Sequence, residues 1–153
     1  MKPLFAVFAL TLAAGCAPAV QASAAVAVTG AWCRAAPVGA LTGGCYLTLT
    51  ADADDRLISV ATPAAKRTEI HSMDMTGGVM RMRQLKDGLA LPAGKAVTLK
   101  PGAEHVMIIA PKKTLAAGGT VPLTLTFKTA PPKKISAPIR DAATPATHHH
   151  EGH

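Results

Sequence analysis

Apolar and polar residues alternate with a period of two along most of this chain, and this pattern restricts its fold more than any other feature. In TVPLTLTFKTA, which begins at position 120, one side carries apolar residues and the other carries threonines and a lysine. The apolar side consists of Val121, Leu123, Leu125 and Phe127. This spacing is typical of a strand with one buried face.

Similar short runs recur at 25–35, 43–51, 56–61, 67–73, 78–85, 96–100, 104–110 and 133–140. Turn-forming sequences separate many of these runs, and among them we place Gly43-Gly44, Gly77-Gly78 and Gly118-Gly119. Seven to nine short strands at this spacing predict a β-sandwich or small barrel. The chain of 153 residues is long enough for one domain with its own core, and a brief helical turn is expected near Thr62 to Lys66.

The N-terminal segment has the layout of a secretory signal peptide, with basic Lys2, an apolar run and then small residues. Cleavage after Ala22 makes residues 1–22 the leader, and this is the processing we favour. Ala13-Ala14-Gly15-Cys16 is the alternative, a lipobox in which Cys16 becomes acylated. We expect a periplasmic protein that is soluble or lipid-anchored. No later run reaches the ~18 apolar residues of a transmembrane span.

Export also bears on the cysteines. Once Cys16 is removed or acylated, Cys33 and Cys45 remain as a pair. In an oxidising compartment two such cysteines on neighbouring strands favour a disulfide, and a dithiol metal site is the alternative.

A formal net charge of +7 is one feature of proteins that bind nucleic acid. The lysines occur as short separate pairs without interleaved aromatic residues, and the leader directs the chain out of the cell. We therefore expect no nucleic-acid partner, and a basic surface suited to acidic proteins.

Four of the five methionines beyond the initiator fall in HSMDMTGGVMRM, residues 71–82. Residues two apart share a strand face, so Met80 and Met82 face one side, and His105 and Met107 share a face in the sequence HVM. The Gly77-Gly78 turn predicts a hairpin that joins the strand of His71 to the strand of Met82.

Methionine also fills cores, and for a single His-x-Met pair packing is the commoner explanation. Here the methionines cluster around a histidine in a segment rich in Gly and Asp. Thioethers are soft and carry no proton, so a His/Met set selects Cu(I) over cations that prefer oxygen.

Four segments, GAWCRAAPVGALTGGCYLTL, EIHSMDMTGGVMRMRQL, LPAGKAVTLKPGAEHVMII and TVPLTLTF, resemble the periplasmic copper chaperones called PCu(A)C. The resemblance spans about residues 25–140. The family signature is a His, ten residues, a Met, about twenty-one residues, and His-x-Met. In this chain ten residues separate His71 from Met82 and twenty-two separate Met82 from His105, so one extra residue falls in the region 88–102.

The resemblance implies an all-β, cupredoxin-like or immunoglobulin-like Greek-key sandwich over residues 23–140. It implies Cu(I) held by His71, Met82, His105 and Met107. The clustering of methionines in residues 71–82 adds Met73 and Met80 as candidate auxiliary ligands. The implied function is a monomeric metallochaperone, not an enzyme, which delivers copper to a recipient such as cytochrome c oxidase subunit II. Copper storage or tolerance, or a structural sandwich without metal, are the alternatives.

Residues 141–153 lose the apolar pattern and are expected to form a flexible tail. Its histidines are His148, His149, His150 and His153. Family members often carry such extensions, and the resemblance implies that these histidines bind a second copper ion, as Cu(II). A weakly chelating tail without dedicated function is the alternative.

Two further classes fit poorly. A blue-copper site needs a thiolate beside two imidazoles, and no histidine lies near Cys33 or Cys45 in the sequence. A hydrolase of the common types would carry G-x-S-x-G or H-E-x-x-H, and neither occurs.

Overall fold

The computed structural model describes residues 24–141, and this range contains ten strands and no helix, which confirms the all-β class. The strands are β1 (Val26–Arg34), β2 (Thr42–Ala51), β3 (Asp55–Ala61), β4 (Ala65–Thr76), β5 (Val79–Gln84), β6 (Leu89–Leu91), β7 (Ala96–Leu99), β8 (His105–Pro111), β9 (Thr120–Phe127) and β10 (Lys133–Arg140). Nine of them coincide with the alternating runs of the sequence. The tenth, β6, has three residues, which is too short to show a period.

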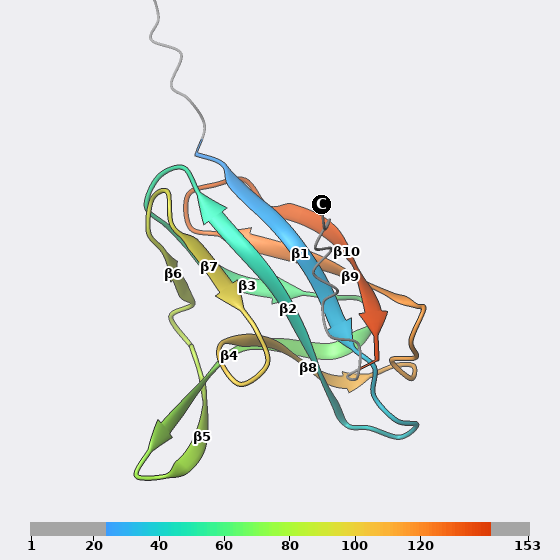
Figure 1. The fold of residues 1–153 in the computed structure, drawn as a ribbon. Coiled ribbons are helices and arrows are strands. Elements are labelled where there is room, and N and C mark those ends of the chain that lie inside the picture. Colours follow the sequence, from blue (N-terminus) through green and yellow to red (C-terminus); the bar gives the residue numbers. More distant parts are fainter. Residues whose placement is uncertain (1–23, 142–153) are drawn as a thin grey trace, which may run out of the picture.

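The strands form two layers joined along one edge (Figure 1). One layer has the order β5-β4-β8-β2-β1, with β7 also pairing with β2, and the other has the order β10-β9-β3-β6. The layers connect through a short parallel pairing of β1 with β10, in which Cys33 lies opposite Ile139 and Arg34 opposite Arg140. The predicted β-sandwich is confirmed.

Alternation along the strands decides which side chains enter the core between the layers. In β9 the residues Val121, Leu123, Leu125 and Phe127 are all buried, as the period of two predicts. From the facing layer Leu47 and Leu49 of β2 and Ile108 of β8 complete the packing. Burial of these side chains provides the main stabilisation of the fold, about 1.5–3 kcal/mol for each large residue.

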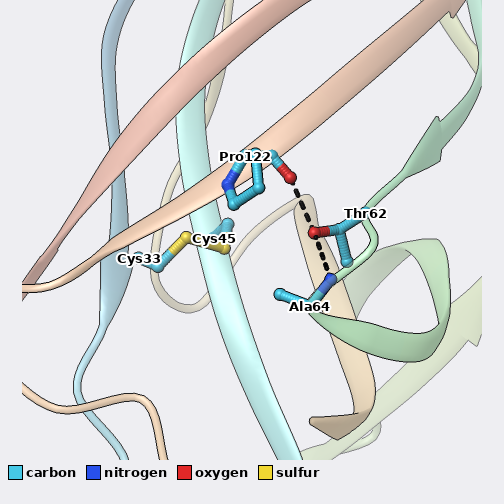
Figure 2. Close-up of a disulfide and its surroundings, with 5 residues drawn as sticks. All are labelled: Cys33, Cys45, Thr62, Ala64 and Pro122. Carbon is cyan, nitrogen blue, oxygen red and sulfur yellow. Dashed lines mark hydrogen bonds between the residues drawn. A yellow bond between two sulfur atoms is a disulfide. The ribbon is translucent and has the colours of Figure 1, made fainter. Parts of the chain in front are cut away.

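A disulfide links the first two strands on the core side of their sheet (Figure 2). Cys33 of β1 and Cys45 of β2 are directly opposite in the antiparallel register, with 4.0 Å between their Cα atoms. Both residues are fully buried. The structure thus joins the two cysteines that the sequence pairs, beneath the sheet that carries the histidines.

Two local expectations are wrong. Residues 62–66 form no helical turn: Pro63 and Ala64 make a tight turn before β4. The Thr62 hydroxyl donates a hydrogen bond to the Pro122 carbonyl at 2.6 Å and accepts one from the Ala64 amide at 3.2 Å, which fixes the turn against β9 (Figure 2). A threonine that bonds the backbone two residues on favours a turn over a helix.

Gly43 and Gly44 are the second correction, because they lie inside β2 and make no turn. Their lack of a side chain serves packing. A Cβ at Gly43 would collide with the Leu115 side chain on the core face, and a Cβ at Gly44 would lie 2.7 Å from the Tyr46 hydroxyl oxygen on the outer face.

The predicted leader at residues 1–22, the acylation site Cys16 and the tail histidines lie outside the described residues. Within residues 24–141 there is no helix long and apolar enough to cross a membrane.

Candidate metal centre

Two histidines face each other on adjacent strands of the first layer. His71 of β4 and His105 of β8 are directly opposite in the antiparallel register, and their ring centroids are 5.8 Å apart. Directly opposite residues project from the same face of a sheet. Their strand neighbours Ile70 and Val106 point into the core, so both histidines lie on the outer face.

Methionines occupy the same outer face. Met107 lies two residues beyond His105 on β8, and Met82 of β5 is directly opposite Met73, which lies two residues beyond His71 on β4. Gly77 and Gly78, both with positive φ, form the turn of this hairpin, as predicted. The fold therefore brings soft side chains from three adjacent strands to one face.

These side chains line an open hollow of about 450 Å³. Of the four residues expected as ligands, Met82, His105 and Met107 contribute to its wall, and Met73 and Met80 line it as well. His71 is not part of the wall and lies beside His105. The remaining wall residues are Arg34, Thr42, Gly43, Gly44, Tyr46, Pro101 and Gly102.

One nitrogen of His71 is engaged and the other is free. Nε2 lies 2.8 Å from Oε2 of Glu69, and the other carboxylate oxygen accepts a hydrogen bond from Nε of Arg67 at 2.9 Å. The hydrogen bond with His71 and the neighbouring Arg67 charge hold the pKa of Glu69 below its usual value, so the carboxylate is ionised and Nε2 is the donor.

Nδ1 of His71 then carries a lone pair. It is buried and has no hydrogen-bond partner among residues 24–141. A buried nitrogen without a partner is costly in a folded protein and calls for an explanation such as an ion.

His105 shows the same arrangement on the other ring nitrogen. Its Nδ1 lies 3.0 Å from the carbonyl oxygen of Ala103, and since a carbonyl only accepts, Nδ1 carries the proton. Nε2 is left with a lone pair in a side chain that is only 6% exposed. Histidines that bind metals characteristically donate their second N–H to a carboxylate or a carbonyl in this way.

An aromatic pair supports the cavity wall. Tyr46 lies over Gly44, which is directly opposite Met107, and its ring centroid is 4.7 Å from that of Trp32 on β1. Neither Tyr46 nor Glu69 was singled out from the sequence. The pattern Glu-x-His in β4, with both residues on one face, is the signal that could have identified Glu69.

The donor set differs from the sites of harder metals. No cluster of three or more His, Cys, Asp or Glu residues able to hold a metal occurs in the described part of the chain. What gathers instead is a pair of imidazoles with free nitrogens beside thioethers, a combination that suits a soft monovalent ion. The residues present therefore fit Cu(I).

The fold and the hollow define a class of protein, a β-sandwich with imidazoles and thioethers on the outer face of one sheet. The chain belongs to the LpqE-like family: the family model described as "Putative lipoprotein LpqE-like" matches residues 26–139. A curated relative, "Putative lipoprotein Lxx21020" of Leifsonia xyli subsp. xyli, is 28% identical over 135 residues, which cover 83% of this chain and 81% of the relative.

Solved structures agree with this assignment. The copper-bound PCuAC domain from PmoF2 is 25% identical, with a TM-score of 0.62, over 76% of this chain and 92% of that domain. Apo-DR1885 from Deinococcus radiodurans is 30% identical, with a TM-score of 0.59, over 91% of this chain and 97% of that one. Its Cu(I) form is 28% identical, with a TM-score of 0.61, over 74% and 77%. The resemblance to PCu(A)C domains is confirmed, and the chain has the fold of a copper chaperone domain.

Proposed function

We propose that this protein is an exported carrier of copper that binds one Cu(I) ion and passes it to a recipient protein. The proposed ligands are His71, Met82, His105 and Met107. The observation that carries the proposal is that each histidine has one nitrogen held by a hydrogen bond and the other left with a lone pair, on the sheet face where His105 and the methionines line one hollow.

The chemistry of the donors supports Cu(I) as the bound form. Neutral thioethers stabilise Cu(I) better than Cu(II), and they need no deprotonation before they bind. The two cysteines of the described chain are joined to each other and buried on the core side, so they leave the soft chemistry to methionine.

The position of the hollow suits transfer. β5 is an edge strand with every residue exposed, and Met82 is 46% exposed. A recipient's ligands can therefore approach the ion from solvent and replace the donors one at a time, so that copper is never released as a free ion.

The compartment and the recipient belong to the same proposal. The N-terminal sequence has the layout of a signal peptide, and the family description and one curated relative carry the word lipoprotein in their names. We infer delivery outside the cytoplasm, with the copper centre of cytochrome c oxidase subunit II as the recipient that the family resemblance implies. The histidines of the tail would hold a second copper, as Cu(II), for which imidazoles are suitable ligands.

An anaerobic competition titration with a Cu(I) chelator tests the proposal. Replacing Met82 and Met107 by Leu keeps two apolar side chains of similar volume but removes both sulfurs. Affinity for Cu(I) should fall by more than about 100-fold, beyond the effect of losing an outer-shell partner of a metal ligand. Unchanged affinity would mean that these methionines only fill space, as in a structural sandwich.

A further inference from the structure

The hairpin of β4 and β5 continues past the proposed site. β4 pairs with β8 only as far as His71 opposite His105, and beyond that point it pairs with β5 alone. Figure 1 shows this hairpin projecting from the lower edge of the sandwich. Two further cross-strand pairs on it consist only of methionines: Met73 opposite Met82, and Met75 opposite Met80.

All four methionines project from the face that carries the histidines. Residues 71, 73 and 75 alternate along β4, and residues 80 and 82 are the direct partners of two of them. Met73, Met80 and Met82 line the same hollow as His105 and Met107, which supports this orientation independently. The opposite face of the hairpin carries hydroxyl and charged groups, including Asp74, whose carboxylate lies 3.6 Å from Arg83 Nε.

Exposure increases steadily from the histidines to the hairpin tip. His105 is 6% exposed, Met82 46%, Met80 59% and Met75 68%. Side chains this exposed contribute little to the core, so packing does not account for Met75 and Met80. Methionines at the tip must be explained by what they do in solvent.

The spacing allows an ion to pass between neighbouring pairs. Same-face residues along a strand are about 6.6 Å apart, and opposite residues on paired strands are about 5 Å apart. Methionine has three rotatable bonds, so sulfurs of adjacent pairs can approach one ion together.

We propose that Met75 and Met80 form a separate loading site for Cu(I), from which the ion moves through Met73 and Met82 to His105 and Met107. At each step one copper–sulfur or copper–nitrogen bond forms as another copper–sulfur bond breaks. Copper stays monovalent throughout, and no proton moves because thioethers carry none. This inference rests on the proposed function and adds a path to it.

The test compares the full-length protein with its Met75→Leu variant, because Met75 belongs to the hairpin tip but does not line the hollow of the proposed main site. Both are mixed anaerobically with a Cu(I)–bicinchoninate complex in a stopped-flow instrument, and the loss of the chelator colour is followed. The variant should load about tenfold more slowly, as expected for a barrier raised by about 1.4 kcal/mol. Its equilibrium affinity for Cu(I) should stay within about twofold of the unsubstituted protein, since a transfer path changes the rates of copper loading and copper release equally.

Val79→Leu is the matched control, because Val79 lies in the same turn region but on the opposite face, and it should load at the rate of the unsubstituted protein. Ag(I) titration followed by NMR of the methionine methyl groups gives a second readout. The methyls of Met82 and Met107 should shift with the first equivalent and those of Met75 and Met80 with the second.

The outcomes separate the two proposals. Equal loading rates, or tip methyl groups that never shift, would overturn the loading site and leave the carrier function intact. A large loss of equilibrium affinity in the variant would also overturn it, because the tip would then be part of the main site. Failure of the unsubstituted protein to bind Cu(I) at all would overturn both.

Discussion

The Glu69 carboxylate accepts a hydrogen bond from the His71 imidazole, with 2.8 Å between Oε2 and Nε2, and thereby directs the lone pair of His71 to the buried Nδ1. The carboxylate is itself fixed by Arg67. Glu69 thus positions the proposed ligand His71 without being a proposed ligand itself.

Replacing Glu69 by Gln tests this role. The amide can accept from His71 but carries no charge, so the proton is held less firmly on Nε2 and the ring is less well oriented. We expect the affinity for Cu(I), measured by competition titration, to fall about 10- to 100-fold, the usual effect of losing an outer-shell partner. Asp87→Asn is the control, because it likewise removes one carboxylate charge but at an exposed position. Equal affinities in the two variants would show that Glu69 does not position His71.

Replacing Gly44 by Ala should displace Tyr46, which lines the hollow. Alanine at this position would place its Cβ 2.7 Å from the Tyr46 hydroxyl oxygen and 3.2 Å from Cζ of the same ring. The Tyr46 ring must therefore move away from β2 at the point where Gly44 lies opposite Met107. We expect a loss of about 1–3 kcal/mol in the free energy of unfolding, as for other overpacked sites. The fluorescence of Trp32, the only tryptophan, should also change because Tyr46 packs against it.

Two related variants sharpen this prediction. Adding Tyr46→Phe to Gly44→Ala removes the closest atom, so the double variant should recover part of the lost stability. Gly43→Ala should destabilise the fold through the Leu115 contact but leave the Trp32 signal nearly unchanged, since that contact lies on the core face. Identical behaviour of the two glycine variants would contradict the assignment of faces.

Asp55 predicts how stability depends on pH. Burial alone would raise the pKa of its carboxyl group, but hydrogen bonds from the backbone amides of Ala130, Arg56 and Thr129 outweigh burial and lower the pKa. A lowered folded-state pKa contributes stability above the unfolded value of about 3.9, and this contribution is lost as the pH falls through the folded-state value.

Asp55→Asn should therefore lower the free energy of unfolding at pH 7 by about 1 kcal/mol, as expected for weakened hydrogen bonds. The difference from the unsubstituted protein should shrink below about pH 4, where the carboxyl group becomes protonated in the unfolded chain. Denaturant titrations at several pH values measure it. A difference that stays constant down to pH 2 would contradict this explanation.

The disulfide predicts a loss of stability without a loss of metal binding. Cys33 and Cys45 are 12 residues apart, and opening a loop of this size costs about 3 kcal/mol. The Cys33→Ala/Cys45→Ala variant should melt at a lower temperature, yet bind Cu(I) with an affinity within about twofold of the original, because both residues lie on the core face. A large loss of Cu(I) affinity would instead favour a dithiol metal site.

Much of the fold could be predicted because apolar and polar residues alternate in almost every strand. The Gly77-Gly78 hairpin and the shared face of His105 and Met107 follow from local geometry alone, and the structure has both. The period of two indicates which residues share a face, but not which neighbouring strand lies beside them. The pairing of His71 with His105 across β4 and β8 is such a long-range contact.

The features that the sequence did not predict depend on packing between neighbouring strands. Gly43-Gly44 looks like a turn because glycine is common in turns, whereas here Leu115 and Tyr46 need the space on the two faces of β2. Glu69 resembles any exposed acidic residue until His71 and Arg67 are seen on either side of its carboxylate. The strand β6 is too short to carry a pattern.

X-ray absorption of the protein loaded anaerobically with one equivalent of Cu(I) identifies the atoms that bind the ion. We expect monovalent copper bound directly by both sulfur and nitrogen atoms, and loss of the sulfur contribution in the Met82→Leu/Met107→Leu variant. A first shell of nitrogen and oxygen only, unchanged by these substitutions, would contradict the proposed site.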